Sequence, residues 1–195
     1  MVVDAVPRLR SWIAVAAIAL LSACASKPPI LPPGEVSVER FELSGRVAVK
    51  LDGSGHSARM RWLHYPESDA IWLYSPIGST IATLNADAES ATLVTARKET
   101  FRSENVQALT REILGWDLPL PGLQHWVLGR VDPAMPVREV KRDDQSRITR
   151  LVQGDWQIDF AGYEDGGTLP RSLLLNFANL RLRLVIDRWN LALPG

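Results

Sequence analysis

The chain has few of the residue types that build disulfides, metal centres and catalytic sites. Its 195 residues include one cysteine, Cys24, so no disulfide can form within the chain. The three histidines, His56, His64 and His125, are expected in a turn, at a strand end and in a short helix, and their spacing fits no metal site. Nucleophile elbows, P-loops and dinucleotide fingerprints are also missing. We therefore predict no metal, no cofactor and no enzymatic activity.

The chain also lacks an excess of charge of either sign. Lys and Arg together number 22, and Asp and Glu together number 22. Nucleic-acid binding relies on a strong positive field, so we expect no nucleic acid among the partners. A neutral chain has no general attraction to anionic lipid either. The acidic pair Asp143-Asp144 lies in a polar run, Glu139 to Arg150, which predicts a solvated hairpin and no catalytic carboxylate pair.

The N-terminus has the parts of a bacterial lipoprotein signal. Arg8 and Arg10 precede an apolar run, Trp12 to Leu21, which is too short to cross a bilayer because a spanning helix needs about 20 residues. The sequence Leu21-Ser22-Ala23-Cys24 then matches the lipobox, where such signals are cut and lipidated. We predict that residues 1–23 are a signal peptide and that lipid is attached to Cys24. The alternative is a secreted protein with an incidental cysteine.

A tether and one domain are expected after the signal. Residues 24–37 contain prolines at positions 28, 29, 32 and 33 and show no apolar periodicity, so they predict a semi-rigid tether. Ala25 and Ser26 follow Cys24 where aspartate would favour retention in the inner membrane, so we expect an outer-membrane destination. Residues 38–195 fit one domain by length and contain neither a second linker nor a repeat.

This domain has the period-two pattern of strands with one apolar face. Apolar and polar residues alternate in segments 46–51, 59–62, 155–160 and 180–187, and turn signals occur at 52–55, 66–69, 85–87 and 165–167. Helical spacing predicts two helices, Ser103–Gly115 and Gly122–Gly129. Because a sheet with one apolar face must cover it, we predict a mainly β fold, an incomplete antiparallel barrel with a lid of short helices.

The space under that lid is either a solid core or a hollow pocket, and the sequence leaves both alternatives open. Trp62, Trp126, Trp156 and Phe160 are large enough to fill a core or to line a pocket. Periodicity cannot distinguish the two, and patterning alone favours the solid core.

One turn has an apolar tip. Pro76 and Gly78 predict a turn between two strands, yet Ile77 stands between them, where polar residues are usual. Ile77 either folds back onto the core or points outward to a membrane or an apolar ligand.

A series of short motifs runs in order through almost the whole mature chain. They are Phe41-x-Leu43-x-Gly45-Arg46, Arg61-Trp62, Ser75-Pro76-Ile77-Gly78-Ser79-Thr80, Leu114-Gly115, Leu118-Pro119-Leu120, Leu123-x-x-Trp126-Val127-Leu128-Gly129, Trp156, Leu169-Pro170, and Leu180 to Asp187 followed by Trp189. In this order, behind a lipobox, they resemble the LolB family of outer-membrane lipoprotein receptors.

The resemblance implies an incomplete antiparallel barrel whose helical lid covers an apolar cavity for acyl chains. It also implies the partners, which are the periplasmic lipoprotein carrier LolA, cargo lipoproteins and the inner leaflet of the outer membrane. The domain is expected to be a monomer that faces the periplasm, with no nucleotide and no catalysis. The rival hypothesis is an outer-membrane scaffold lipoprotein that binds proteins without lipid transfer. An enzyme acting on lipid or cell wall would need a polar cluster in the cavity.

The resemblance assigns a membrane-transfer loop to Pro76, Ile77 and Gly78. The tip of this loop is typically leucine in the family, so Ile77 is expected to point outward. The alternation supplies candidates for the acyl cavity, if alternate residues face inward. These candidates are Val47, Val49, Met60, Trp62, Leu73, Leu84, Leu93, Trp126, Trp156, Ile158, Phe160, Leu182, Leu184 and Ile186.

Overall fold

The computed structural model describes residues 40–193. Residues 38–195 form a compact unit, and its hydrophobic core is built from side chains between Phe41 and Trp189. The domain therefore carries its own core. The predicted signal peptide, Cys24 and most of the chain before β1 lie outside the described residues. No helix within residues 40–193 is long and apolar enough to span a bilayer.

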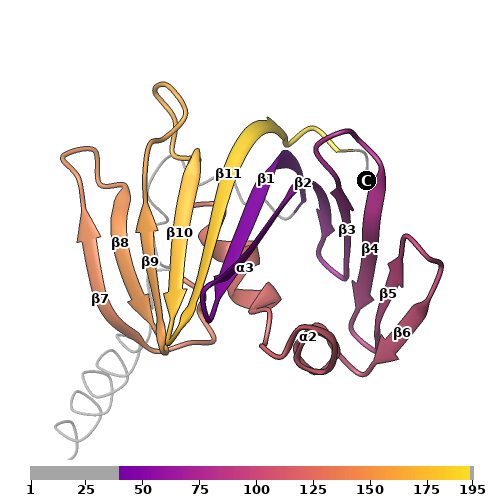
Figure 1. Cartoon of the computed structure of the whole chain (residues 1–195). Helices are drawn as coiled ribbons and strands as arrows, with labels where there is room; N and C mark the ends of the chain where they lie inside the picture. Colours follow the sequence, from indigo (N-terminus) through magenta and orange to yellow (C-terminus); the bar gives the residue numbers. More distant parts are fainter. Residues whose placement is uncertain (1–39, 194–195) are drawn as a thin grey trace, which may run out of the picture. The chain divides into compact units, whose positions relative to one another are not determined.

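In residues 40–193, eleven antiparallel strands form one open sheet (Figure 1). Strands that follow one another in the sequence pair side by side from β1 to β6 and from β7 to β11, and β1 pairs with β11 to join the two series. Within the described residues β6 and β7 are edge strands, so the sheet stays open and the predicted incomplete antiparallel barrel is confirmed. The strands are β1 (Phe41–Leu51), β2 (Ser54–Tyr65), β3 (Ser68–Tyr74), β4 (Thr80–Asp87), β5 (Ala91–Thr95), β6 (Thr100–Ser103), β7 (Val137–Arg142), β8 (Ile148–Gln153), β9 (Trp156–Phe160), β10 (Ser172–Phe177) and β11 (Leu180–Asn190).

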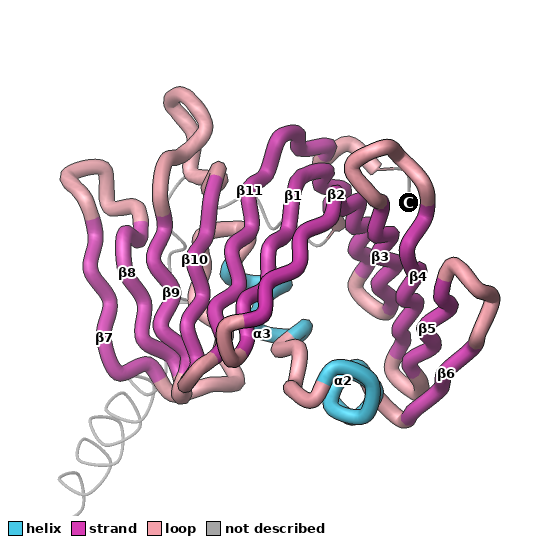
Figure 2. Tube along the Cα trace, viewed as in Figure 1, coloured by secondary structure: helices cyan, strands magenta, loops and turns pink. Residues whose placement is uncertain are grey.

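The long central strands bend the sheet around two helices. Figure 2 shows β11, β1 and β2 arching, with β7–β10 on one side of the helices and β3–β6 on the other. The alternation in β11 follows this curvature, because Leu182 and Leu184 are buried on the inner face while Arg181 and Arg183 are exposed on the outer face. The core therefore lies inside the curve, under the helices.

Helix α2 spans Val106–Leu114. It begins at Asn105, whose side-chain oxygen accepts a hydrogen bond from the backbone N–H of Ala108 at 2.8 Å. Ser103, the expected start, is instead the last residue of β6. Gly115 ends the helix with a φ of 78°, a left-handed conformation that glycine adopts without strain. The predicted helix is confirmed, with a later start.

Helix α3 spans Leu120–Trp126 and replaces the expected Gly122–Gly129. It begins earlier than predicted because Pro121 fits the first helical turn, where a backbone N–H has no helical partner. It also ends earlier than predicted, with Trp126 as its last residue and Val127 as its C-cap.

Three predicted turns have different bounds. The β1–β2 turn is Asp52-Gly53 alone, so His56 lies within β2 and the expectation of a turn was wrong. The turn predicted at 66–69 comprises residues 66–67 alone, because β3 begins at residue 68. The segment predicted as a turn at 85–87 belongs to β4, and the turn follows at 88–90. There the Asp87 carboxylate accepts hydrogen bonds from the backbone N–H groups of Glu89 and Ser90, at 2.9 and 2.8 Å. In all three cases strand pairing extends through polar residues, because backbone hydrogen bonds do not depend on side-chain polarity.

The backbones of β1 and β11 lie very close at Gly45. The register between the two strands shifts between Ser44 and Gly45, which marks a β-bulge. A Cβ atom at position 45 would collide with the carbonyl oxygen of Val185. Glycine is therefore required at this position of the central strand pair.

We expect Gly45→Ala to lower the free energy of unfolding by about 1–3 kcal/mol, because the added methyl group pushes β1 away from β11. Gly55→Ala in β2 is the matched control, since a Cβ there would have the Val49 carbonyl oxygen as its near neighbour at 3.8 Å. Chemical denaturation of the domain measures both variants. Equal effects of the two substitutions would contradict the steric explanation.

Candidate functional site

An apolar cavity of about 150 Å³ lies between the inner face of the sheet and the helices. Strands β1 to β5 and β11 form one wall, and α2, α3 and the segment between them form the other. Nine of the predicted cavity residues line it: Val47, Val49, Met60, Trp62, Leu73, Leu84, Leu93, Leu182 and Leu184. The inner face is therefore hollow in this half of the sheet.

The other five predicted residues lie outside the cavity: Trp126, Trp156, Ile158, Phe160 and Ile186. We correct their assignment from cavity to solid core. Helix α3 fills the space on their side of the sheet, where Trp126 packs on Trp156 with ring centroids 6.1 Å apart. The indole N–H of Trp126 also donates to Oε1 of Gln153 at 2.9 Å. Alternation is the same in both halves, so the sequence could not separate the filled half from the hollow one.

Eight further residues line the cavity: Ile71, Ala82, Thr110, Leu114, Trp116, Leu118, Leu120 and Leu123. Most of them belong to the helices and their connection, which the strand pattern did not address. A signal was present, because every second residue from Leu114 to Leu120 is apolar and lines the cavity. Ile71 was missed because the run Ile71–Tyr74 is apolar throughout, so alternation gave no direction.

The cavity offers no free polar group. The hydroxyl of Thr110 donates to the Val106 carbonyl oxygen at 2.9 Å and accepts from the Leu118 backbone N–H at 2.9 Å. No titratable side chain is among the described residues that line the cavity. Residues 40–193 also contain no group of three or more His, Cys, Asp or Glu side chains that could hold a metal ion. The site can therefore accept an apolar ligand by burial, and it offers no group for proton transfer.

A wider groove continues from the cavity to the surface. The groove measures about 740 Å³ and shares five wall residues with the cavity: Val47, Val49, Leu73, Leu114 and Trp116. Ile81 and Ile113 extend its apolar wall, while Asp52, Ser54 and Ser57 form part of a polar rim. Leu114 is 48% exposed here although it belongs to both spaces. An apolar path therefore leads from solvent into the cavity, past the C-terminal end of α2.

A buried carboxylate fixes α3 to the sheet. Asp69 on β3 accepts hydrogen bonds from the Trp62 indole N–H at 2.7 Å and from the Gln124 amide of α3 at 2.7 Å. Its Oδ1 also lies 2.8 Å from Nδ1 of His64. Since Asp69 is only 7% exposed, these donors replace the water that the carboxylate loses.

The other end of α3 is held by Gln153. This fully buried side chain accepts from the Asp132 backbone N–H at 3.0 Å and donates to the Met135 carbonyl oxygen at 3.0 Å, so it ties down the loop after the helix. Burial lowers the pKa of the adjacent His125, although Asp132, 3.9 Å away, acts in the opposite direction. The lowered pKa favours a neutral imidazole next to the core. Helix α3 is thus bonded to β3 through Gln124 and to β8 through Trp126.

Helix α2 differs from α3 in its side-chain hydrogen bonds. Its side-chain hydrogen bonds within the described residues stay inside its own segment, as in the pair between Arg111 and Asp117, whose Nε and Oδ1 are 2.7 Å apart. The Arg111 guanidinium lowers the pKa of Asp117, so the pair persists at neutral pH. The strands in contact with α2 are β5 and β6, at the edge of the sheet. Within the described residues, helix α2 is thus held against the sheet by packing, whereas α3 also has side-chain hydrogen bonds to strands.

The turn between β3 and β4 presents Ile77 to solvent. The backbone N–H of Gly78 donates to the Ser75 carbonyl oxygen at 2.9 Å, and that of Ser75 donates to the Ser79 carbonyl oxygen at 2.8 Å. Gly78 has a φ of 91°, which glycine adopts without strain. Ile77 is 90% exposed, so it does not fold back onto the core. The turn therefore holds an apolar side chain in water.

Comparison with known proteins agrees with this geometry. The model of the family described as "Outer membrane lipoprotein LolB" matches residues 39–189, from the start of β1 almost to the end of β11. The chain belongs to the LolB family. The outer-membrane lipoprotein LolB of Nitrosomonas europaea is 34% identical over 165 residues, which cover 83% of this chain and 77% of that protein. The LolB of Azoarcus sp. is 33% identical over 189 residues, which cover 94% and 96%.

A solved structure shows the same fold at low sequence identity. The DUF1329 family protein from Desulfovibrio piger superimposes with a TM-score of 0.53 at 8% identity, covering 80% of this chain and 87% of that chain. The LolB family model spans every wall of the cavity and the Ile77 turn. The family expected from the sequence motifs is therefore confirmed.

We expect Asp69→Ala to lower the free energy of unfolding by about 3 kcal/mol, because it leaves the buried indole N–H of Trp62 and the partly buried amide of Gln124 without an acceptor. Asp165→Ala is the control, since the Asp165 side chain is 98% exposed and its loss should change stability by at most about 0.5 kcal/mol. Thermal and chemical denaturation measure the difference. Similar stability of the two variants would show that α3 does not depend on Asp69.

Proposed function

We propose that this domain is the receptor that accepts lipoproteins from the periplasmic carrier LolA and inserts them into the outer membrane. The observation that carries the proposal is the apolar cavity, whose one polar side chain, Thr110, is fully engaged. Acyl chains are ligands that such walls can bind without any specific polar contact. Membership of the LolB family, whose relatives are named outer-membrane lipoproteins, supports the same conclusion.

Acyl entry requires the lid to open. The cavity of about 150 Å³ is smaller than the roughly 300–1,000 Å³ of typical ligand pockets, so it holds only part of a cargo lipid. Displacing α2 would widen the passage between the cavity and the adjacent groove and uncover the inner face of β1 to β5. Each acyl chain that enters gains about 25 cal/mol per Å² of buried apolar surface, which offsets the loss of lid contacts. The carrier can therefore pass its lipid down an affinity gradient without nucleotide hydrolysis.

The Ile77 turn would complete the transfer. An exposed isoleucine on a hydrogen-bonded turn can enter the acyl boundary of a membrane and bring the loaded domain to the inner leaflet. In this proposal Pro76 and Gly78 shape the membrane-transfer loop. Lipid on Cys24 and the tether of residues 24–37 would keep the domain, as a monomer, on the periplasmic face of the outer membrane.

A scaffold lipoprotein is the weaker hypothesis. It would need a docking patch but no cavity, and it leaves unexplained why α2 covers an apolar space that side chains do not fill. A catalytic function finds no support among the described residues that line the cavity, since none of them can take up or donate a proton.

We expect Ala82→Phe to reduce cargo acceptance at least tenfold, because Ala82 lines the cavity and a benzyl group would fill part of it. Ala88→Phe is the control, since Ala88 is exposed in the β4–β5 turn. The assay measures how much lipoprotein the domain strips from LolA, with a fluorescent fatty-acyl probe as a second readout. Equal acceptance by Ala82→Phe and the control, with both variants folded, would contradict an acyl site in this cavity.

We expect Ile77→Glu to leave cargo acceptance from LolA intact and to impair insertion into membranes, because a carboxylate at the tip of the turn cannot enter the acyl region. Val137→Glu on edge strand β7 is the control, since Val137 is also exposed, at 47%, but lies outside the turn. Ile77→Leu should retain insertion. Reconstituted transfer from LolA to vesicles separates the two steps, and unchanged insertion by Ile77→Glu would remove the turn from the mechanism.

A further inference from the structure

The outer face of the central strands carries both paired and unpaired cations. Arg46 contacts Asp187 at 2.8 Å, and Arg61 contacts Glu42 at 2.7 Å. Five exposed cations of the same strands have no such carboxylate within the described residues. One of them, Arg188, lies opposite Ser44, away from the end of β1. The other four form the outer cation patch, which consists of Lys50, Arg59, Arg181 and Arg183.

Two cations of the patch face each other across the β1–β11 pair. Lys50 lies directly opposite Arg181 in the register, and Arg183 follows two residues further along β11 on the same face. Like charges in directly opposite positions destabilise a sheet. A neutral residue at either position would remove this repulsion, and a bound anion would convert it into two charge-assisted hydrogen bonds.

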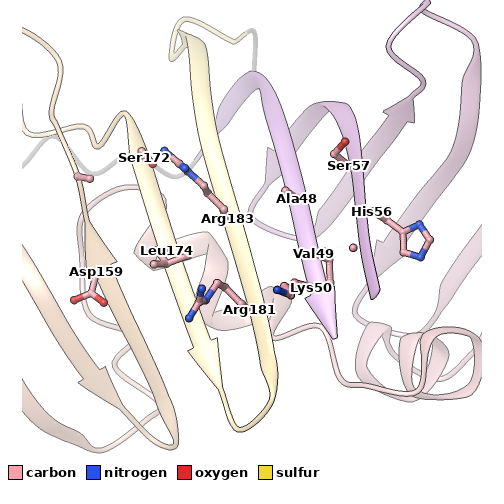
Figure 3. A pocket seen from close by; sticks show the side chains of 12 residues that line it. Ala48, Val49, Lys50, His56, Ser57, Asp159, Ser172, Leu174, Arg181 and Arg183 are labelled. Atoms are coloured by element: carbon pink, nitrogen blue, oxygen red, sulfur yellow. The ribbon is translucent and has the colours of Figure 1, made fainter. Parts of the chain in front are cut away.

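A shallow depression of about 670 Å³ lies over this part of the sheet (Figure 3). Lys50, Arg181 and Arg183 border it, together with the hydroxyl groups of Ser57 and Ser172. Among the described residues that line it, the one acidic side chain is Asp159, which is engaged by Arg150 of β8 at 2.6 Å. Guanidinium, ammonium and hydroxyl groups around a depression are the donors that bind phosphate groups.

One residue of the outer cation patch lies beside β3, the strand that leads to the Ile77 turn. Arg59 of the patch pairs in register with Tyr74, the last residue of β3, and the turn follows at once. Lys50 stands next to the end of β1, where β2 begins. A phospholipid membrane offers an anionic headgroup layer next to an acyl region, which matches cations next to an exposed isoleucine.

We propose that the outer cation patch binds the phosphate groups of anionic phospholipids and docks the domain on a membrane surface. The choice of a membrane as the partner rests on the proposed function. The position of Lys50 opposite Arg181 is independent of that function. Docking of this kind requires no cargo and no lid movement. It orients the outer face of β1 and β11 toward the headgroups before the Ile77 turn delivers lipid.

The test uses the cargo-free domain and sedimentation with vesicles of phosphatidylcholine, with or without about one third phosphatidylglycerol. Each Lys or Arg at an anionic surface strengthens binding roughly fivefold, so the double variant K50Q/R181Q should bind anionic vesicles roughly 25-fold more weakly. The matched control is R138Q/K141Q, which removes the same charge from edge strand β7. It should bind within about twofold of the unmodified domain, and salt of about 0.5 M should abolish the difference.

Stability supplies an independent readout. Because K50Q/R181Q removes a repulsion, its melting temperature should equal or exceed that of the unmodified domain. Equal losses of vesicle binding in both double variants would overturn the proposal, since net charge alone would then explain attachment. Binding of inorganic phosphate at about millimolar concentration, together with no binding to anionic vesicles, would also overturn it, because the patch would then bind free phosphate. Cargo transfer from LolA is measured separately, so failure of acyl acceptance and failure of headgroup binding remain distinguishable.

Discussion

An antiparallel sheet with one apolar face must cover that face, and the rest of this domain depends on how two short helices do so. The sheet has eleven strands, whereas α2 and α3 have nine and seven residues. Helix α3 is fixed by Asp69 and Gln153 and fills one half with Trp126. The other half keeps an apolar space that no side chain fills. The cavity is thus a consequence of covering a wide sheet with too little helix.

In the proposed mechanism this unequal coverage divides the lid into a fixed and a movable part. Helix α3 is bonded to strands on both sides of the inner face, whereas α2 contacts β5 and the edge strand β6 and keeps its own hydrogen bonds within its segment. A lid of this design can open at α2 without disturbing the solid half of the core. The Thr110 hydroxyl satisfies the Leu118 backbone N–H, so α2 and the connection behind it can move as one piece without exposing an unpaired group to lipid.

The outer face obeys a different constraint from the inner face. The whole chain has no net charge, and the sequence therefore predicts no general attraction to anionic lipid. Net charge says nothing about arrangement, however. Pairing with Asp187 and Glu42 neutralises Arg46 and Arg61, while register brings Lys50 opposite Arg181 with no carboxylate between them. A neutral protein thus carries a local positive surface on the outer face of β1 and β11.

The sequence by itself determined the family, the mainly β class and the inward direction of strands such as β11, because alternation and motif order are local properties. It also located both helices to within a few residues. It could not decide which inward residues line the cavity, since Phe160 and Leu184 alternate alike and only the position of α3 separates them. Nor could it decide the exposure of Ile77, the closeness of Gly45 to β11 or the opposition of Lys50 and Arg181. Those depend on contacts between segments far apart in the chain, which only the tertiary structure brings together.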